Sequence, residues 1–209
     1  MSTLETSLYT RKEFMKSQSC RALHAACMTE KHARRFYLQA ARRMEEDGLY
    51  VIAHALRFTA AQEKEHADIF CGLLTAFGGS CLPTAEDAPV ILPDDPITLL
   101  RSAAQDEHEE WDQLYPAGAR IADQEGYPRI AGAFRRIAET EQTHALRFLQ
   151  YAKALAEGTL FHASRRISWL CLPCGQLHTG TEAPAACSSC GRDQGHFIRS
   201  SFYPFVLER

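Results

Sequence analysis

Two Glu-x-x-His pairs interrupt two otherwise apolar helix faces, and they constrain the fold more than any other feature of this sequence. Glu63 and His66 stand on one face, and Glu141 and His144 stand on the other. An isolated ionised carboxylate in such a place costs many kcal/mol, so each pair needs a compensating partner inside the fold. The other residues on these faces are mostly apolar and recur at steps of three and four residues. They are Ile52, Leu56, Thr59, Phe70 and Phe77 for the first pair and Ile130, Phe134, Ile137, Phe148, Tyr151 and Leu155 for the second.

Three further glutamates fall on apolar helix faces in register with these pairs. Glu30 shares a face with Leu23, Ala33, Tyr37 and Met44, and Glu107 and Glu110 share one with Leu100, Ala103, Leu114 and Ile121. Glu63 follows Glu30 by 33 residues, and Glu141 follows Glu107 by 34, so the sequence has two similar halves. Two αα-hairpins that each supply one glutamate and one Glu-x-x-His pair are the ligand scheme of di-iron and di-manganese bundles.

The kind of metal follows from the ligand types. Oxygen-rich sites with one imidazole per cation suit iron or manganese better than zinc or copper, and we expect iron, with manganese as the alternative. A single Glu-x-x-His motif is more often a solvated helix face, but two of them in register with further buried glutamates favour a metal site. Four neighbours lie off the apolar faces and are expected to be solvated or to support the ligands from outside: Glu65, His108, Glu109 and Glu139.

Capping and stop signals divide the rest of the first domain into long helices. Asp47-Gly48 and Gly78-Gly79 end two helical stretches, and Asp95-Pro96 is typical of a helix start. Prolines 83, 89 and 93 indicate a non-helical crossover between the hairpins. The pattern predicts an all-α, four-helix ferritin-like bundle within residues 1–160, with helices over residues 17–46, 49–77, 95–126 and 128–157.

Four of the eight cysteines form two close pairs near the C-terminus. Cys171 and Cys174 are separated by twelve residues from Cys187 and Cys190, a spacing that places four thiolates around one tetrahedral metal. The cysteines alone favour a structural zinc site, but attachment to a candidate di-iron bundle favours one iron atom, with zinc possible. We expect a small metal-dependent domain over residues 168–209, after a linker over residues 158–167, and buried thiols at Cys20, Cys27, Cys71 and Cys81.

Composition excludes several other classes of function. The formal charge of −3 is spread along 209 residues without basic blocks, so neither nucleic acid nor an anionic membrane is an expected partner. The first residues carry no signal-like apolar core, and a cytoplasmic location is expected. No Gly-rich dinucleotide motif is present, so electrons from NAD(P)H would have to arrive through another protein.

The local motifs resemble those of the rubrerythrin family from about Cys20 to Phe197. In the helical part they are QEKEHA around Glu63, EHEEWDQLYP from Glu107 and EGYPRIAGAFRRIAETEQTH ending at His144. In the tail, Trp169 precedes the first cysteine pair, GTEAP precedes the second, and His196-Phe197 follows. The resemblance implies a ferritin-like di-iron bundle followed by a rubredoxin-like domain.

By this resemblance seven residues match the family's di-iron ligands: Glu30, Glu63, His66, Glu107, Glu110, Glu141 and His144. Glu63 and Glu141 would bridge the two metals, and Glu110 and His66 would exchange as ligands of one iron on reduction. Tyr37 and Tyr115 fall where the family has tyrosines near the pocket, and they could donate hydrogen bonds to a bound peroxide or be ordinary core residues.

The resemblance also implies an activity and partners. The expected reaction is reduction of hydrogen peroxide to water, with electrons relayed through the tetracysteine iron from rubredoxin or a flavin-dependent NAD(P)H reductase. A head-to-tail homodimer is expected. The alternatives are an iron-oxidising, iron-handling protein and a scaffold with a zinc ribbon and a vestigial metal site. The sequence departs from the family in a longer N-terminal lead, a crossover that contains Cys81, and the C-terminal extension SFYPFVLER.

Overall fold

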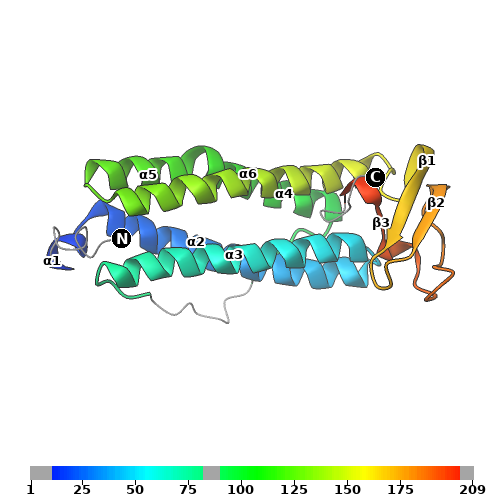
Figure 1. Cartoon of the computed structure of the whole chain (residues 1–209), viewed down its shortest axis with the longest axis horizontal. Helices are drawn as coiled ribbons and strands as arrows, with labels where there is room; N and C mark the ends of the chain where they lie inside the picture. The colour runs from blue at the N-terminus through cyan, green and yellow to red at the C-terminus, as the bar shows by residue number, and fades with distance from the viewer. Residues whose placement is uncertain (1–10, 82–89, 203–209) are drawn as a thin grey trace.

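The structure, a computed structural model, describes residues 11–81 and 90–202. Figure 1 shows an elongated helical bundle with a small β-sheet at one end. The helices are α1 (Arg11–Phe14), α2 (Gln18–Glu46), α3 (Tyr50–Ala76), α4 (Pro96–Glu109), the π-helical segment η1 (Glu110–Leu114), α5 (Tyr115–Gln124) and α6 (Pro128–Ala156). The strands are β1 (His162–Cys171), β2 (Leu177–Glu182) and β3 (Phe197–Arg199), with short 3-10 turns η2 (Gln194–His196) and η3 (Ser200–Phe202).

The predicted ferritin-like bundle is confirmed, and its helices begin and end close to the expected signals. Ser17 caps α2 by accepting a hydrogen bond from the Cys20 amide, and Asp95 caps α4 by accepting one from the Thr98 amide. Gly78 follows α3 in the left-handed conformation, at φ 85°. The predicted crossover contains Pro83 and Pro89, which lie outside the described residues. Residues 203–209 of the C-terminal extension also lie outside them.

The third predicted helix is not a continuous α-helix. A π-helical turn, η1, lies between α4 and α5, and it inserts one extra residue into the helical repeat. Leu114, which we expected on the buried face, is therefore 53% exposed, while Tyr115 takes the inward position and is 2% exposed. The prediction for Leu114 was wrong because sequence spacing was read at a constant 3.6 residues per turn.

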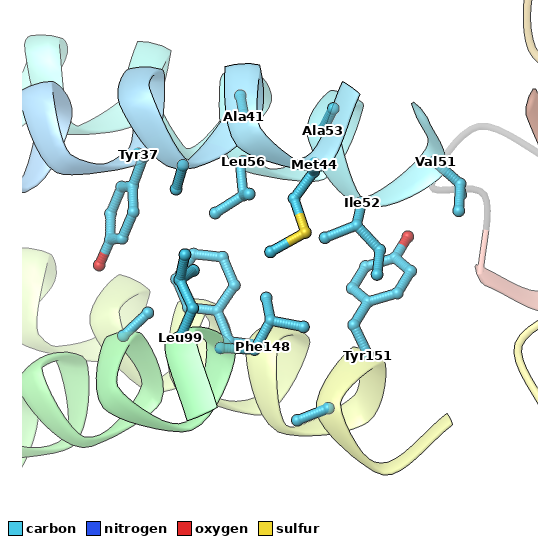
Figure 2. Packing of buried hydrophobic residues seen from close by; sticks show 14 of the residues in the cluster. Tyr37, Ala41, Met44, Val51, Ile52, Ala53, Leu56, Leu99, Phe148 and Tyr151 are labelled. Carbon is cyan, nitrogen blue, oxygen red and sulfur yellow. The ribbon is translucent and has the colours of Figure 1, made fainter. Parts of the chain in front are cut away.

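Apolar residues fill the bundle on both sides of the glutamates. One buried cluster extends from Tyr37 toward the β-sheet end, and Figure 2 shows Met44, Leu56 and Phe148 pointing into the space between the hairpins. A second cluster, which includes Phe134, fills the opposite end. The glutamates lie between these two clusters along each helix, so the site is closed at both ends by apolar packing. Among the helices that the structure describes, none combines the length and apolar composition that a bilayer crossing needs.

The C-terminal sheet packs against the end of the bundle. Its strands are antiparallel in the order β2-β1-β3, and Trp169, Cys171 and Phe197 belong to its own small core. Ile198 belongs to the apolar cluster of the bundle. Gly195 lies so close to the backbone carbonyl of Gly48 that a Cβ could not fit there. Strand β1 begins at His162, so it includes part of the segment expected as linker.

Candidate metal centres

All seven predicted ligands of the bundle are buried. They come from α2 and α3 in the first hairpin and from α4, η1 and α6 in the second. Glu30 lies on α2, Glu107 on α4 and Glu110 at the start of η1. One Glu-x-x-His pair lies on α3 and the other on α6, and within each pair the glutamate and the histidine are about one helical turn apart. The four residues expected off the buried faces, Glu65, His108, Glu109 and Glu139, are all exposed.

The ligand atoms form two overlapping groups. One group contains Glu30, Glu63, His66 and Glu141, and within it the potential ligand atoms lie within 4.8 Å of one another. The other contains Glu63, Glu107, Glu141 and His144 under the same limit. Glu63 and Glu141 belong to both groups, which is the arrangement that two carboxylates bridging a pair of metals require. Glu110 is buried beside them but belongs to neither group.

The two imidazoles face the shared carboxylates through the same ring nitrogen. Nδ1 of His144 lies 2.7 Å from Oε2 of Glu141 and 2.9 Å from Oε1 of Glu63. Nδ1 of His66 lies 2.9 Å from Oε1 of Glu141 and 3.1 Å from Oε2 of Glu63. The two halves of the molecule therefore present matching donor sets, as the internal repeat in the sequence predicts.

Gln62 is a supporting residue that the sequence reasoning missed. Its Oε1 lies 3.1 Å from Nε2 of His144 and 3.4 Å from Nη1 of Arg147. Because an amide oxygen only accepts hydrogen bonds, Nε2 of His144 carries a proton, and in the neutral ring Nδ1 is then the nitrogen that can bind a metal. Gln62 directly precedes Glu63 in the motif QEKEHA, but nothing in its spacing indicates a contact with a histidine 82 residues away.

The two predicted pocket tyrosines are buried, and each binds a glutamate of the other hairpin. The Tyr37 hydroxyl donates to Oε1 of Glu107 at 2.5 Å, and the Tyr115 hydroxyl donates to Oε1 of Glu30 at 2.5 Å. Tyr37 follows Glu30 by seven residues, whereas Tyr115 follows Glu107 by eight. The π-helical turn accommodates this extra residue, so Tyr115 occupies a position in the second hairpin equivalent to that of Tyr37 in the first.

The buried glutamates of this cluster favour the binding of cations. Burial raises the pKa of Glu107 to about 8 and that of Glu110 to about 10. Burial works against charge on the histidines as well, but the surrounding glutamates outweigh it and raise the pKa of His66 to about 12 and that of His144 to about 11. Without metal, the cluster approaches neutrality by holding protons, and divalent cations would displace those protons.

Several ligand atoms make no hydrogen bond to the residues that the structure describes. They are Oε2 of Glu30, Oε1 of Glu63, Oε2 of Glu107, both carboxylate oxygens of Glu141 and Nδ1 of His144. Buried polar atoms are otherwise satisfied in folded proteins, so a set of them converging on one place indicates a missing ligand. The donor set of carboxylate oxygens with one imidazole per group fits iron or manganese.

The four paired cysteines also converge. The Sγ atoms of Cys171 and Cys190 lie 3.6 Å apart, and those of Cys174 and Cys187 lie 3.7 Å apart. A tetrahedral metal with metal–sulfur bonds of about 2.3 Å separates its sulfurs by about 3.8 Å. Each Cys-x-x-Cys pair is followed by a glycine with positive φ whose amide donates to the carbonyl of the first cysteine. The sulfurs therefore fit one tetrahedral metal.

Two of the four cysteines outside the Cys-x-x-Cys pairs differ from the prediction of buried thiols. Cys20 and Cys27 are buried thiols, as expected. Cys71 and Cys81 are only half-buried and are joined by a disulfide, so the prediction of buried thiols was wrong for them. The Gly78-Gly79 turn folds the segment that contains Cys81 back to the end of α3.

Comparison with known proteins identifies the family. The sequence matches the family model of rubrerythrin over residues 21–152 and that of the rubrerythrin rubredoxin-like domain over residues 169–198. The chain belongs to the rubrerythrin family. A rubrerythrin from Clostridium perfringens is 38% identical over 169 residues, covering 80% of this chain and 87% of the relative. A rubrerythrin from Nitratidesulfovibrio vulgaris is 36% identical over 186 residues, covering 89% and 96%.

Solved structures agree with this membership. The fully reduced, all-ferrous state of nigerythrin superimposes with a TM-score of 0.62 at 26% identity, covering 88% of this chain and 90% of that one. A bacterioferritin from Desulfovibrio desulfuricans has a TM-score of 0.63 at 20% identity, covering 68% of this chain and 82% of that one, and shows the shared fold alone. This rubrerythrin-family chain thus combines a ferritin-like helical domain with a rubredoxin-like domain.

Proposed function

We propose that this chain reduces hydrogen peroxide to water at a di-iron site in the bundle, with electrons relayed through an iron bound by the four paired cysteines. The observation that carries the proposal is that Glu63 and Glu141 belong to both ligand groups, on a chain that also has a tetracysteine cluster. Reduction of H₂O₂ to two waters requires two electrons and two protons. A pair of ferrous ions bound there would supply both electrons, one from each iron.

The proposed ligands take roles that follow from their positions. Glu63 and Glu141 would be shared by the two metals. Glu30 and His66 would complete one side, and Glu107 and His144 would complete the other, with carboxylates and imidazoles oriented by their neighbours. Glu110 is buried next to these groups but outside both, while His66 lies inside one. This placement supports the proposed exchange of Glu110 and His66 as ligands of one iron.

We assign Tyr37 and Tyr115 to the pocket as hydrogen-bond donors. Each hydroxyl donates to a terminal glutamate, which fixes the orientation of that carboxylate and keeps one of its oxygens directed at the ligand group. In this geometry the tyrosines act on Glu107 and Glu30, and a role toward bound peroxide requires the hydroxyls to turn from those carboxylates. Together with Glu110 and His66 they are the residues that we propose as catalytic.

The position of the small domain supports transfer between two subunits. Twelve residues of α6, about 18 Å of helix, separate His144 from Ala156, and the tetracysteine site lies beyond that end. A head-to-tail homodimer would bring the cysteine-bound iron of one subunit to the di-iron site of the other. The electrons entering it would come from rubredoxin or a flavin-dependent NAD(P)H reductase.

Two single variants test this assignment by separating the two centres. Glu141→Ala removes a carboxylate shared by both groups, so iron bound in the bundle should fall while tetracysteine iron stays. Cys174→Ser should do the reverse and abolish NAD(P)H-driven turnover, because the small domain depends on its metal. Metal analysis and visible absorbance of each purified variant measure both effects. Unchanged bundle iron in Glu141→Ala would refute the site, and full turnover in Cys174→Ser would refute the relay.

A further inference from the structure

Three cysteine sulfurs lie together outside both metal centres. Cys27 is on α2, Cys71 is near the end of α3, and Cys81 follows α3 at the start of the crossover. Cys71 and Cys81 form a disulfide. The Sγ of Cys27 lies 2.7 Å from that of Cys71 and 3.5 Å from that of Cys81. Figure 1 shows that this end of α3 is the end of the bundle opposite the β-sheet.

The surroundings of the three sulfurs favour thiol chemistry over metal binding. Nζ of Lys31 lies 3.3 Å from the Sγ of Cys81, and an ammonium in that place stabilises a thiolate. The same positive charge opposes a metal cation among the sulfurs. Cys27 is buried, whereas Cys71 and Cys81 are half-buried, so the disulfide is the part that an external reagent can reach.

We propose that Cys27, Cys71 and Cys81 form a thiol–disulfide exchange site that takes electrons from a dithiol reductant. A dithiol breaks the Cys71–Cys81 bond through a mixed disulfide, and its second thiol then closes the reductant's own disulfide. Two electrons and two protons pass to the two cysteine sulfurs. Hydrogen peroxide reverses the change, because two thiols lose two electrons and two protons while H₂O₂ becomes two waters.

Cys27 gives the site an internal exchange step. Its thiolate attacks Cys71, the Cys71–Cys81 bond breaks, and a Cys27–Cys71 bond forms. Cys81 leaves as a thiolate beside Lys31 and takes up the proton that Cys27 has lost. No net electrons are needed. The exchange moves the cross-link so that it joins α2 to α3, and it leaves Cys81 as the reactive thiol at the half-exposed position.

Peptide mapping can follow this exchange because of where trypsin cuts. Cys27 falls in the peptide of residues 22–31, whereas Cys71 and Cys81 fall together in the peptide of residues 65–101. A Cys71–Cys81 disulfide therefore stays within one peptide, and a Cys27–Cys71 disulfide joins two. The metal-loaded full-length protein would be reduced with dithiothreitol, oxidised with one equivalent of hydrogen peroxide, alkylated and digested. This readout is independent of the proposed peroxide reductase activity.

The variants give distinct expected results. Oxidised unmodified protein should contain mainly the within-peptide disulfide, together with a smaller amount of the joined peptides that the internal exchange produces. Cys81→Ser should form the Cys27–Cys71 cross-link, and Cys27→Ser should retain the Cys71–Cys81 loop and never show joined peptides. Cys20→Ser, which removes a buried thiol outside the cluster, should behave as the unmodified protein does.

Lys31 provides a second test that needs no cysteine change. Lys31→Met should slow the reduction of the disulfide by dithiothreitol about three- to tenfold at neutral pH, because the leaving thiolate of Cys81 loses its cation. Lys153→Met, at an exposed position near the end of α6, is the control and should leave the rate unchanged. The proposal is overturned if peroxide leaves all three thiols reduced, if joined peptides form in neither Cys81→Ser nor the unmodified protein, or if the purified cluster holds stoichiometric zinc that Cys27→Ser releases.

Discussion

Three of the proposed ligands of the bundle have a neighbouring side chain that fixes their orientation. The Tyr37 and Tyr115 hydroxyls hold two terminal glutamates, and the amide of Gln62 holds His144. These contacts connect the two hairpins across the candidate site, so these proposed ligands in one half are positioned by side chains of the other. Outer contacts of this kind set the tautomer and direction of a ligand and strengthen metal binding.

The Gln62 contact can be tested by removing the amide. Gln62→Ala leaves Nε2 of His144 without its acceptor, so the ring is free to turn or to change tautomer. We expect metal affinity of the bundle to fall about 10- to 100-fold, with the tetracysteine metal unaffected. Competition with a chelator measures the change. Gln105→Ala, at an exposed position on α4, is the control, and equal metal loss in both variants would contradict the role of Gln62.

Helix patterning explains which parts of the site the sequence could predict. Glu63, His66, Glu141 and His144 fell on apolar faces with regular spacing, and the structure buries all four. Leu114 was misplaced because a π-helical turn changes the period, and no residue preference in EHEEWDQLYP signals that turn. The cysteine cluster was missed for a different reason.

That cluster depends on tertiary contact and not on a helical repeat. Cys27 and Cys71 are 44 residues apart, and they meet because α2 and α3 pack antiparallel. Cys81 joins them only through the turn after α3. Single-sequence periodicity carries no information about such contacts, whereas the Cys-x-x-Cys pairs carry their metal geometry locally.

A carboxylate at the end of α5 stabilises the start of α2. Glu125 accepts hydrogen bonds from the backbone amides of Gln18 and Ser19 and from the Ser19 hydroxyl. Partial burial favours the protonated form of Glu125, but these hydrogen bonds outweigh it and lower its pKa below the ordinary value. Negative charge at a helix N-terminus is also favourable. This contact joins the first hairpin to the second.

Glu125→Gln should therefore lower the free energy of unfolding by about 1 kcal/mol at pH 7, the usual effect of losing a helix cap. A depressed folded-state pKa means that the stabilisation is present above the pKa of the unfolded chain and is lost as pH falls through the folded-state pKa. The difference between variant and unmodified protein should thus shrink as the pH falls below the ordinary pKa of a glutamate, about 4.3. Thermal unfolding at several pH values measures it. Glu139→Gln, at an exposed position, should show no difference, and a pH-independent gap for Glu125→Gln would contradict the assignment.

At the scale of the whole molecule, the two metal centres occupy different parts of an elongated chain. The ligand groups lie within the bundle, and the sheet with its four cysteines packs on one end (Figure 1). Gly195 and Ile198 fix the sheet against the bundle by close packing, so the small domain is not free to reach the proposed metal site of its own bundle. Head-to-tail association would give each site a cysteine-bound iron from the partner subunit.

Mixing two inactive variants tests that association. Glu141→Ala lacks the bundle site and Cys174→Ser lacks the relay, so neither homodimer should turn over with a reductase. After joint unfolding and refolding with iron, mixed dimers combine an intact bundle site with an intact relay from the other subunit. Activity should reappear in proportion to the mixed dimers. Mixed dimers that are present but inactive would mean that electrons pass within one chain.

The proposed peroxide chemistry has one direct test, an anaerobic single-turnover measurement on the fully reduced, iron-loaded protein. One equivalent of hydrogen peroxide takes two electrons, so it should first oxidise both bundle irons. The tetracysteine iron should then pass its electron back to the bundle, and its visible absorbance returns as it becomes ferric. We expect this reaction to be at least about tenfold faster with hydrogen peroxide than with an equal concentration of O₂, a difference of about 1.4 kcal/mol in activation free energy. Oxidation that is faster with O₂, or that consumes added Fe²⁺ and leaves peroxide unchanged, would contradict a peroxide reductase function.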